Sequence, residues 1–183
     1  HDNFNLDFSS ELNSNKWITS KPPAFCKTSD QTILSQVLPS FDQETKDFYR
    51  WVVEYSQEEI SSIIKSKSGI DFGSIVDLIP VERGLSGRLI KLQIVGTKKT
   101  VVVGKELEIR KFLSKSHLYS SAFIIKKSDV RENIPGKFIL NGAGWGHGVG
   151  FCQIGAAVMA VQGYQFDEIL LHYFKDVRLK KIY

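Results

Sequence analysis

The 183-residue sequence is poor in sulfur: it has two cysteines, Cys26 and Cys152, and a single methionine, Met159. Two cysteines are too few for a disulfide scaffold and form no CxxC zinc pattern. We also expect no bound metal and no cofactor. The two thiols can form one bridge or remain reduced, and their spacing does not choose between these states. Because residue 1 is His rather than Met, we expect a processed chain or a piece of a longer one.

Long apolar runs and dense blocks of one charge are also missing. No apolar stretch approaches the roughly 18 residues that span a bilayer, so we expect no transmembrane segment. The 24 Lys and Arg residues exceed the 20 Asp and Glu residues by only four and are spread along the chain, which argues against a nucleic-acid partner. This mild excess suits an anionic surface such as a cell wall or a phospholipid head group, or it is only the charge of an ordinary solvated surface.

Periodicity predicts an α+β fold, with a mixed or antiparallel sheet and helices packed on it. Residues 1–45 are polar and interrupted by Lys21-Pro22-Pro23, so we expect a loop-rich N-terminal lobe with short helices there and a main domain over 46–183. Alternating apolar residues predict strands near 48–55, 75–80, 90–94, 100–103, 122–126, 137–140 and 177–183. Helical spacing predicts helices over 56–69, which a Ser56–Glu59 capping box opens, over 105–113, and as a C-terminal pair over 154–161 and 166–173.

Five glycines stand in the nine residues from Gly142 to Gly150, just before the first helix of that pair. Glycine loses the most backbone entropy on folding, so this density indicates positive φ angles or a close approach of another group. The N–H groups at the start of the following helix suit an anion or a sugar hydroxyl. The GxxxxGK[ST] and GxGxxG spacings are both absent, which argues against a nucleotide site.

Four residues in or beside this segment are candidates for function. His147 has a glycine on each side. Its ring is either exposed to act as an acid, a base or a hydrogen-bond donor, or it only stabilises the loop through hydrogen bonds. Trp145 is either a platform for a sugar or a core anchor. Gln153 either satisfies the loop or reaches a ligand. Cys152 is either a small buried thiol or, with His147, a nucleophile.

The stretch 142–156 (GAGWGHGVGFCQIGA), followed by Met159-Ala160, Gly163 and the run 169–173 (ILLHY), resembles the C-terminal signature of the SpoIID/LytB family (stage II sporulation protein D and amidase enhancer). That signature reads approximately G-x-G-x-G-H-G-V-G-x-S-Q-x-G-A, then M-A, a Gly, and I-L-x-x-Y-Y. The resemblance covers residues 48–183, with a looser fit around Ser86-Gly87-Arg88, Arg110 and 120–123. Cys152 stands where the family more often has Ser, and Phe174 replaces the second Tyr.

The resemblance implies peptidoglycan glycan strands as the partner and a location in the cell envelope or outside the cytoplasm. Sporulation members are lytic transglycosylases, which cleave the MurNAc–GlcNAc bond of peptide-free strands and leave a 1,6-anhydro end. Their general acid is a glutamate in an upstream Ala- and Arg-rich segment that we do not find here, and a family Cys/His zinc cluster is missing too. We therefore expect this chain to supply the glycan-binding, C-terminal portion, with contacts from Trp145, His147, Gln153, Tyr173, Arg88 and Arg110.

The catalytic residue stays unassigned. A single carboxylic acid suffices for a lytic transglycosylase. The candidates within the chain are Glu82, Glu106 and Glu168, and none of them belongs to a recognisable motif. The alternative is a cell-wall-binding module or amidase enhancer that does not cut, with an N-acetylmuramoyl-L-alanine amidase as partner. A third hypothesis is a thiol enzyme that uses Cys152 and His147.

Overall fold

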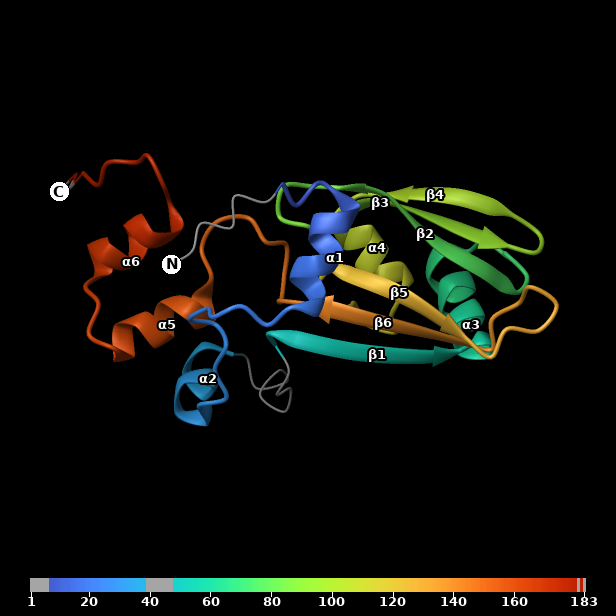
Figure 1. The fold of residues 1–183 in the computed structure, drawn as a ribbon, viewed down its shortest axis with the longest axis horizontal. Coiled ribbons are helices and arrows are strands. Elements are labelled where there is room, and N and C mark those ends of the chain that lie inside the picture. Colours follow the sequence, from blue (N-terminus) through green and yellow to red (C-terminus); the bar gives the residue numbers. More distant parts are fainter. Residues whose placement is uncertain (1–6, 39–47, 181, 183) are drawn as a thin grey trace. The chain divides into compact units, whose positions relative to one another are not determined.

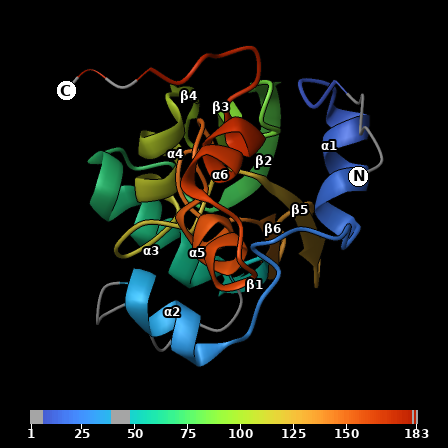
Figure 2. The same ribbon diagram turned by 90° about the vertical axis from the view of Figure 1, so that its left-hand side faces the viewer.

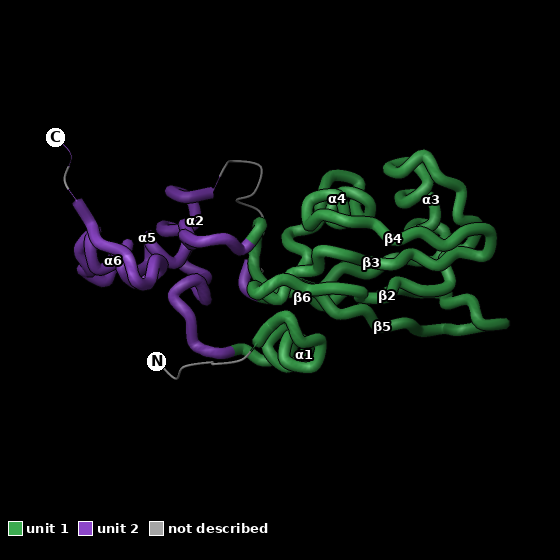
Figure 3. The backbone as a smooth tube through the Cα atoms, turned by 90° about the horizontal axis from the view of Figure 1, so that it is seen from above, with its two compact units in different colours: residues 1–21, 50–147 green, residues 22–49, 148–183 purple. Residues whose placement is uncertain are grey.

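The computed structural model describes residues 7–38, 48–180 and 182, which form six helices and six strands (Figure 1). The chain divides into two compact units (Figure 3). Unit 1 consists of residues 1–21 and 50–147, and unit 2 of residues 22–49 and 148–183. The domain boundary predicted at residues 45 and 46 lies outside the described residues, and that division stays a prediction.

Unit 1 contains two antiparallel three-stranded sheets. One has the order β1 (Arg50–Ser56), β6 (Lys137–Ala143), β5 (Phe123–Ser128). The other has the order β2 (Ile75–Arg83), β3 (Leu89–Gly96), β4 (Thr100–Gly104), in which β3 and β4 form the predicted hairpin. The α+β prediction is confirmed, and the pairing between described strands is antiparallel rather than mixed.

Helix α3 (Gln57–Ser68) begins where β1 ends, and its capping box forms as predicted. The Glu59 backbone N–H donates to Ser56 Oγ at 3.2 Å, and Glu59 Oε2 accepts the Ser56 N–H at 2.8 Å. Gly69 ends the helix in the left-handed region, at φ 70°. Ile60 and Ile64 lie on the buried face and contribute to the core of unit 1.

The core of unit 1 lies between the inner sheet faces, α3 and α4 (Glu106–Phe112). Helix α1 (Glu11–Thr19) packs on β5 and β6, on the side away from α3 and α4 (Figures 1 and 2). Arg83 ties this helix to the sheets, because its buried guanidinium binds both carboxylate oxygens of Glu11, at 2.5 and 2.9 Å, and the Phe123 carbonyl at 2.8 Å.

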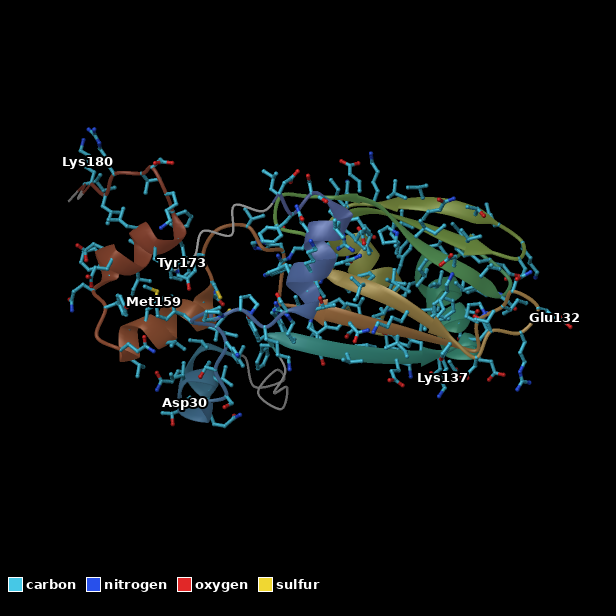
Figure 4. The ribbon with its side chains drawn as sticks, in the orientation of Figure 1. Asp30, Glu132, Lys137, Met159, Tyr173 and Lys180 are labelled. Atoms are coloured by element: carbon cyan, nitrogen blue, oxygen red, sulfur yellow. The ribbon has the colours of Figure 1, made fainter. Side chains whose placement is uncertain are left out.

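Unit 2 is helical: it contains α2 (Gln31–Val37), α5 (Gln153–Val161) and α6 (Phe166–Tyr173), and the last two are the predicted C-terminal pair. Ala156, Met159 and Ile169 form a small core against which Phe25 and Tyr173 pack; Figure 4 labels Met159 and Tyr173. None of the helices in the described ranges has both the length and the apolar character needed to cross a membrane.

The strand predicted over 177–183 is wrong for the residues that the structure describes there, 177–180 and 182. Val177 and Leu179 alternate with Arg178 and Lys180, but both apolar side chains are exposed, as is Ile182, and none of the described strands pairs with this segment. An alternating pattern forms a strand only where a partner supplies the ladder of hydrogen bonds, and the described part of unit 2 contains no sheet.

Candidate functional site

The first part of the glycine-rich segment, residues 142–147, contains the last two residues of β6 and the loop that follows them in unit 1, and we call it the glycine loop. Gly144 and Gly146 have φ angles of 69° and 71°, in the left-handed region that glycine enters without strain. Gly142 has a different reason to be glycine, since a Cβ there would overlap the indole ring of Trp51 on the neighbouring strand. The glycines therefore serve both the turn of the loop and the close packing beneath it.

A row of aromatic rings leads from the core of unit 1 to the glycine loop. The fully buried Phe123 begins this row, and its ring centroid lies 6.3 Å from that of Trp51. The centroid distances are 5.5 Å from Trp51 to Tyr119 and 4.9 Å from Tyr119 to the half-buried Trp145. The Trp51 indole Nε1 also donates to the Gly144 carbonyl at 3.1 Å. The row anchors the Trp145 ring through Tyr119, and Trp145 as a residue is only half-buried.

Arg88 holds the loop backbone. Its side chain is buried, and its Nε donates to the Gly146 carbonyl at 2.8 Å. Its two terminal nitrogens lie 3.5 Å from the carbonyls of Ser86 and Trp145. A guanidinium with this many donors can fix several backbone carbonyls at once, so Arg88 positions the loop. The predicted contact of Arg88 with a glycan stays a prediction.

Residues 118–122 support the loop from behind. The Tyr119 carbonyl accepts the Gly146 N–H at 2.7 Å, and Ser120 Oγ donates to the Ala143 carbonyl at 2.8 Å. Arg110, buried on α4, donates from Nε to the Leu118 carbonyl at 2.6 Å. Arg110 thus contacts the supporting segment, and the structure records no contact between its guanidinium and the glycine loop within the described residues.

Sequence reasoning missed Trp51, Tyr119 and Ser120 as parts of this site. Trp51 had a visible signal, because it shares the inward-facing positions of its strand with Val53 and Tyr55. Tyr119 had none, since it precedes β5 in a stretch without periodicity and reaches the loop only through the fold. Ser120 had only a weak signal, the loose family resemblance of residues 120–123.

His147 follows the braced part of the loop and is exposed, whereas Trp145 two residues earlier is half-buried. An indole ring offers an apolar face to the C–H side of a sugar, and an imidazole offers a donor and an acceptor to its hydroxyls. The two residues together therefore suit a ligand that is both flat and rich in hydroxyl groups.

Gln153 and Tyr173 belong to unit 2, at the start of α5 and the end of α6. Cys152 is the N-cap residue of α5, and its Sγ accepts the Gly155 N–H at 3.4 Å and is hydrogen-bonded to Tyr173. A Cβ on Gly155 would overlap the Tyr173 hydroxyl, so this glycine lets the phenol reach the helix. Burial, and then the nearby Cys152 and Cys26 thiols, raise the pKa of Tyr173 above its usual value.

The predicted contact residues therefore fall into two sets. Arg88, Trp145 and His147 form one set on the glycine loop of unit 1, with Arg110 behind it. Gln153 and Tyr173 form the other at α5 and α6 of unit 2, where Gln153 is exposed and Tyr173 is half-buried.

The three candidate carboxylates have partners of their own. Glu82 pairs with Lys91 at 2.6 Å, Glu106 pairs with Arg110 at 3.4 Å, and Glu168 Oε2 accepts the Gln165 N–H at 2.7 Å as the capping box of α6. Across residues 7–38 and 48–180, no three His, Cys, Asp or Glu side chains gather closely enough to hold a metal ion.

A family model described as "Domain of unknown function (DUF8618)" matches residues 3–150, which include both sheets of unit 1 and the whole glycine loop. The chain belongs to this family. It is also 35% identical over 81 residues to stage II sporulation protein D of Bacillus amyloliquefaciens. That match covers 44% of this chain and 22% of the relative, so the chain spans about a fifth of the relative's length. The predicted relation to stage II sporulation protein D is supported for this part of the chain.

Proposed function

We propose that this chain acts on the cell wall, and that its glycine loop binds the glycan strands of peptidoglycan. It would supply the glycan-binding part of a SpoIID-type lytic transglycosylase, in the cell envelope or outside the cytoplasm. The partial similarity to stage II sporulation protein D supports this direction.

The observation that carries the proposal is the build of the glycine loop. Arg88 and the segment 118–122 hold its backbone from within, while Trp145 is half-buried and His147 is exposed at its outer end. A ligand site needs such a fixed backbone, because ordering a loose loop on binding would cost free energy. Trp145 would stack on a sugar ring, and His147 would hydrogen-bond its hydroxyl or acetamido groups.

The remaining predicted residues take different parts in this proposal. Gln153 and Tyr173 stay proposed glycan contacts of unit 2 on its own. Arg88 and Arg110 would act mainly as positioning residues, since their recorded hydrogen bonds go to backbone carbonyls.

No catalytic residue is assigned within the chain. A lytic transglycosylase needs a carboxylic acid that first protonates the glycosidic oxygen and then takes a proton from the C6 hydroxyl. Glu82, Glu106 and Glu168 each hold another partner, as described above. The same observation favours the second candidate function, a wall-binding module or amidase enhancer that binds glycan, or an N-acetylmuramoyl-L-alanine amidase, without cutting.

The test is mass spectrometry of peptide-free glycan strands after incubation with the chain, alongside co-sedimentation of the chain with the same strands. We expect co-sedimentation without anhydro-ended fragments. Anhydro fragments would place a competent acid within residues 1–183, and their loss in Glu82→Gln would identify it. Faster amidase action on intact wall without new glycan ends would select the enhancer role. If the chain neither co-sediments with the strands nor cleaves them, the proposal is rejected.

A further inference from the structure

Unit 2 brings both cysteines of the chain to one tyrosine. Cys152 caps α5, and its Sγ lies against the backbone of Gly155, where the Tyr173 hydroxyl also approaches. Cys26 is the residue after Phe25, whose ring packs on the core of unit 2 and lies 5.3 Å from the ring of His172, next to Tyr173. Both thiols are close enough to Tyr173 to raise its pKa.

Neither thiol lies in the middle of a regular element. Cys26 occupies a turn before α2, and Cys152 precedes the first residue of α5. Both side chains are half-exposed, and the structure holds both as thiols without a disulfide between them. A disulfide requires Cα atoms within about 7 Å and a specific dihedral angle, so the bridge needs the backbone of the turn or of the cap to bring the two residues to that geometry.

We propose that Cys26 and Cys152 form a reversible disulfide that joins the segment around α2 to the start of α5. The oxidant is a low-molecular-weight disulfide such as oxidised glutathione, or the disulfide of a thiol oxidoreductase. One cysteine thiolate attacks the oxidant and releases one thiol, and the second cysteine then displaces the other. Two protein thiols lose two electrons and two protons, and the oxidant disulfide becomes two thiols.

The bond would change what surrounds Tyr173. In the reduced chain, Cys152 Sγ accepts the Gly155 N–H and is hydrogen-bonded to Tyr173. A disulfide fixes the dihedral angle about its S–S bond. Forming it would turn Cys152 Sγ toward Cys26 and away from the Gly155 N–H and the Tyr173 hydroxyl. Oxidation would therefore fix residues 22–38 to the helix pair and free the Tyr173 hydroxyl.

The experiment is thiol trapping of the purified chain after incubation with oxidised glutathione. Trypsin places Cys26 in the peptide 17–27 and Cys152 in the peptide 138–175, and we expect these two peptides to be linked. Tethered thiols have effective concentrations in the mM range, so bridged chains should outnumber glutathione adducts by about tenfold when reduced glutathione is also present at about 0.1 mM. Cys26→Ser and Cys152→Ser, which conserve size, should each stop at a glutathione adduct.

A matched sample in guanidinium chloride shows whether folding brings the thiols together, because the unfolded chain separates them. Bridging at least tenfold slower in that sample is the expected result. Glutathione adducts on both cysteines without a bridge, disulfide-linked dimers, or equal bridging rates in the folded and unfolded chain would each overturn the proposal. This readout does not depend on glycan binding, so its outcome is separate from that of the proposed function.

Discussion

Several single residues of this chain have structural roles that sequence patterns indicate only in part. The density of glycines from Gly142 to Gly150 predicts a special backbone, and positive φ angles at Gly144 and Gly146 bear this out. The pattern does not show that Gly142 makes room for Trp51, or that Gly155 makes room for Tyr173. Both facts depend on residues far away in the sequence, which only the folded chain brings close.

Gly155→Ala tests the contact with Tyr173. The new methyl would overlap the phenol oxygen, so we expect a loss of about 1–3 kcal/mol in the free energy of unfolding. In Tyr173→Phe the nearest ring atom would lie 3.4 Å from that methyl, an ordinary contact. The double variant should therefore be no less stable than Tyr173→Phe alone, and Ala should then gain up to about 1 kcal/mol over Gly in the helix. Additive losses in urea unfolding would contradict this account.

Arg88→Lys tests the bracing of the glycine loop. Lys keeps the charge but cannot reach the carbonyls of Gly146, Trp145 and Ser86 as guanidinium does, so buried carbonyls lose donors. We expect a loss of about 1–3 kcal/mol in stability and faster amide hydrogen exchange within residues 142–147. The control is Arg131→Lys at an exposed arginine. Unchanged exchange in the loop of Arg88→Lys would show that Arg88 does not hold it.

Whole elements were largely predictable, because their signals are local. The capping box of α3, the hairpin of β3 and β4 and the helix pair α5 and α6 all follow from spacing within a few residues. The strand expected at 177–183 failed for the residues described there, because alternation indicates a strand without showing whether a partner exists.

The helix pair of unit 2 should weaken in acid through His172. Its ring lies 5.3 Å from Phe25 and 4.8 Å from Tyr173, and burial, with a smaller effect from Lys175, lowers the pKa of His172 below 6.5. A base whose folded pKa is depressed favours its neutral form in the fold. Its contribution is complete above the unfolded pKa of 6.5 and is lost as the pH falls through the folded pKa.

Comparing the wild type with His172→Phe measures that contribution. Phe keeps an aromatic ring in the packing but does not titrate, so its unfolding free energy should fall less between pH 7 and pH 5, values that bracket the ordinary pKa of about 6.5. Urea unfolding at a series of pH values provides the measurement. Parallel pH profiles for the two chains would show that His172 carries none of the acid sensitivity.

At the scale of the whole molecule, composition and periodicity were sufficient to predict the α+β class but not the connections that hold the site. Arg83 reaches Glu11 across 72 positions of sequence, and Trp51 reaches Gly144 across 93. No local pattern encodes such pairs, because each depends on which strands become neighbours. The glycine loop was therefore found from sequence, while the hydrogen bonds by which Tyr119 and Ser120 support it are seen only in the fold.

The central claim is that the glycine loop of unit 1 binds peptidoglycan glycan. The most direct measurement is an NMR titration of the nitrogen-15-labelled chain with short peptide-free glycan oligomers. The account predicts shifts concentrated in the amides of residues 142–147 and the Trp145 indole N–H, which should vanish in His147→Ala combined with Trp145→Ala. His117→Ala, at another exposed histidine of unit 1, should leave them in place. Saturable shifts elsewhere that leave the glycine loop unmoved, or no shifts at all, would contradict the claim.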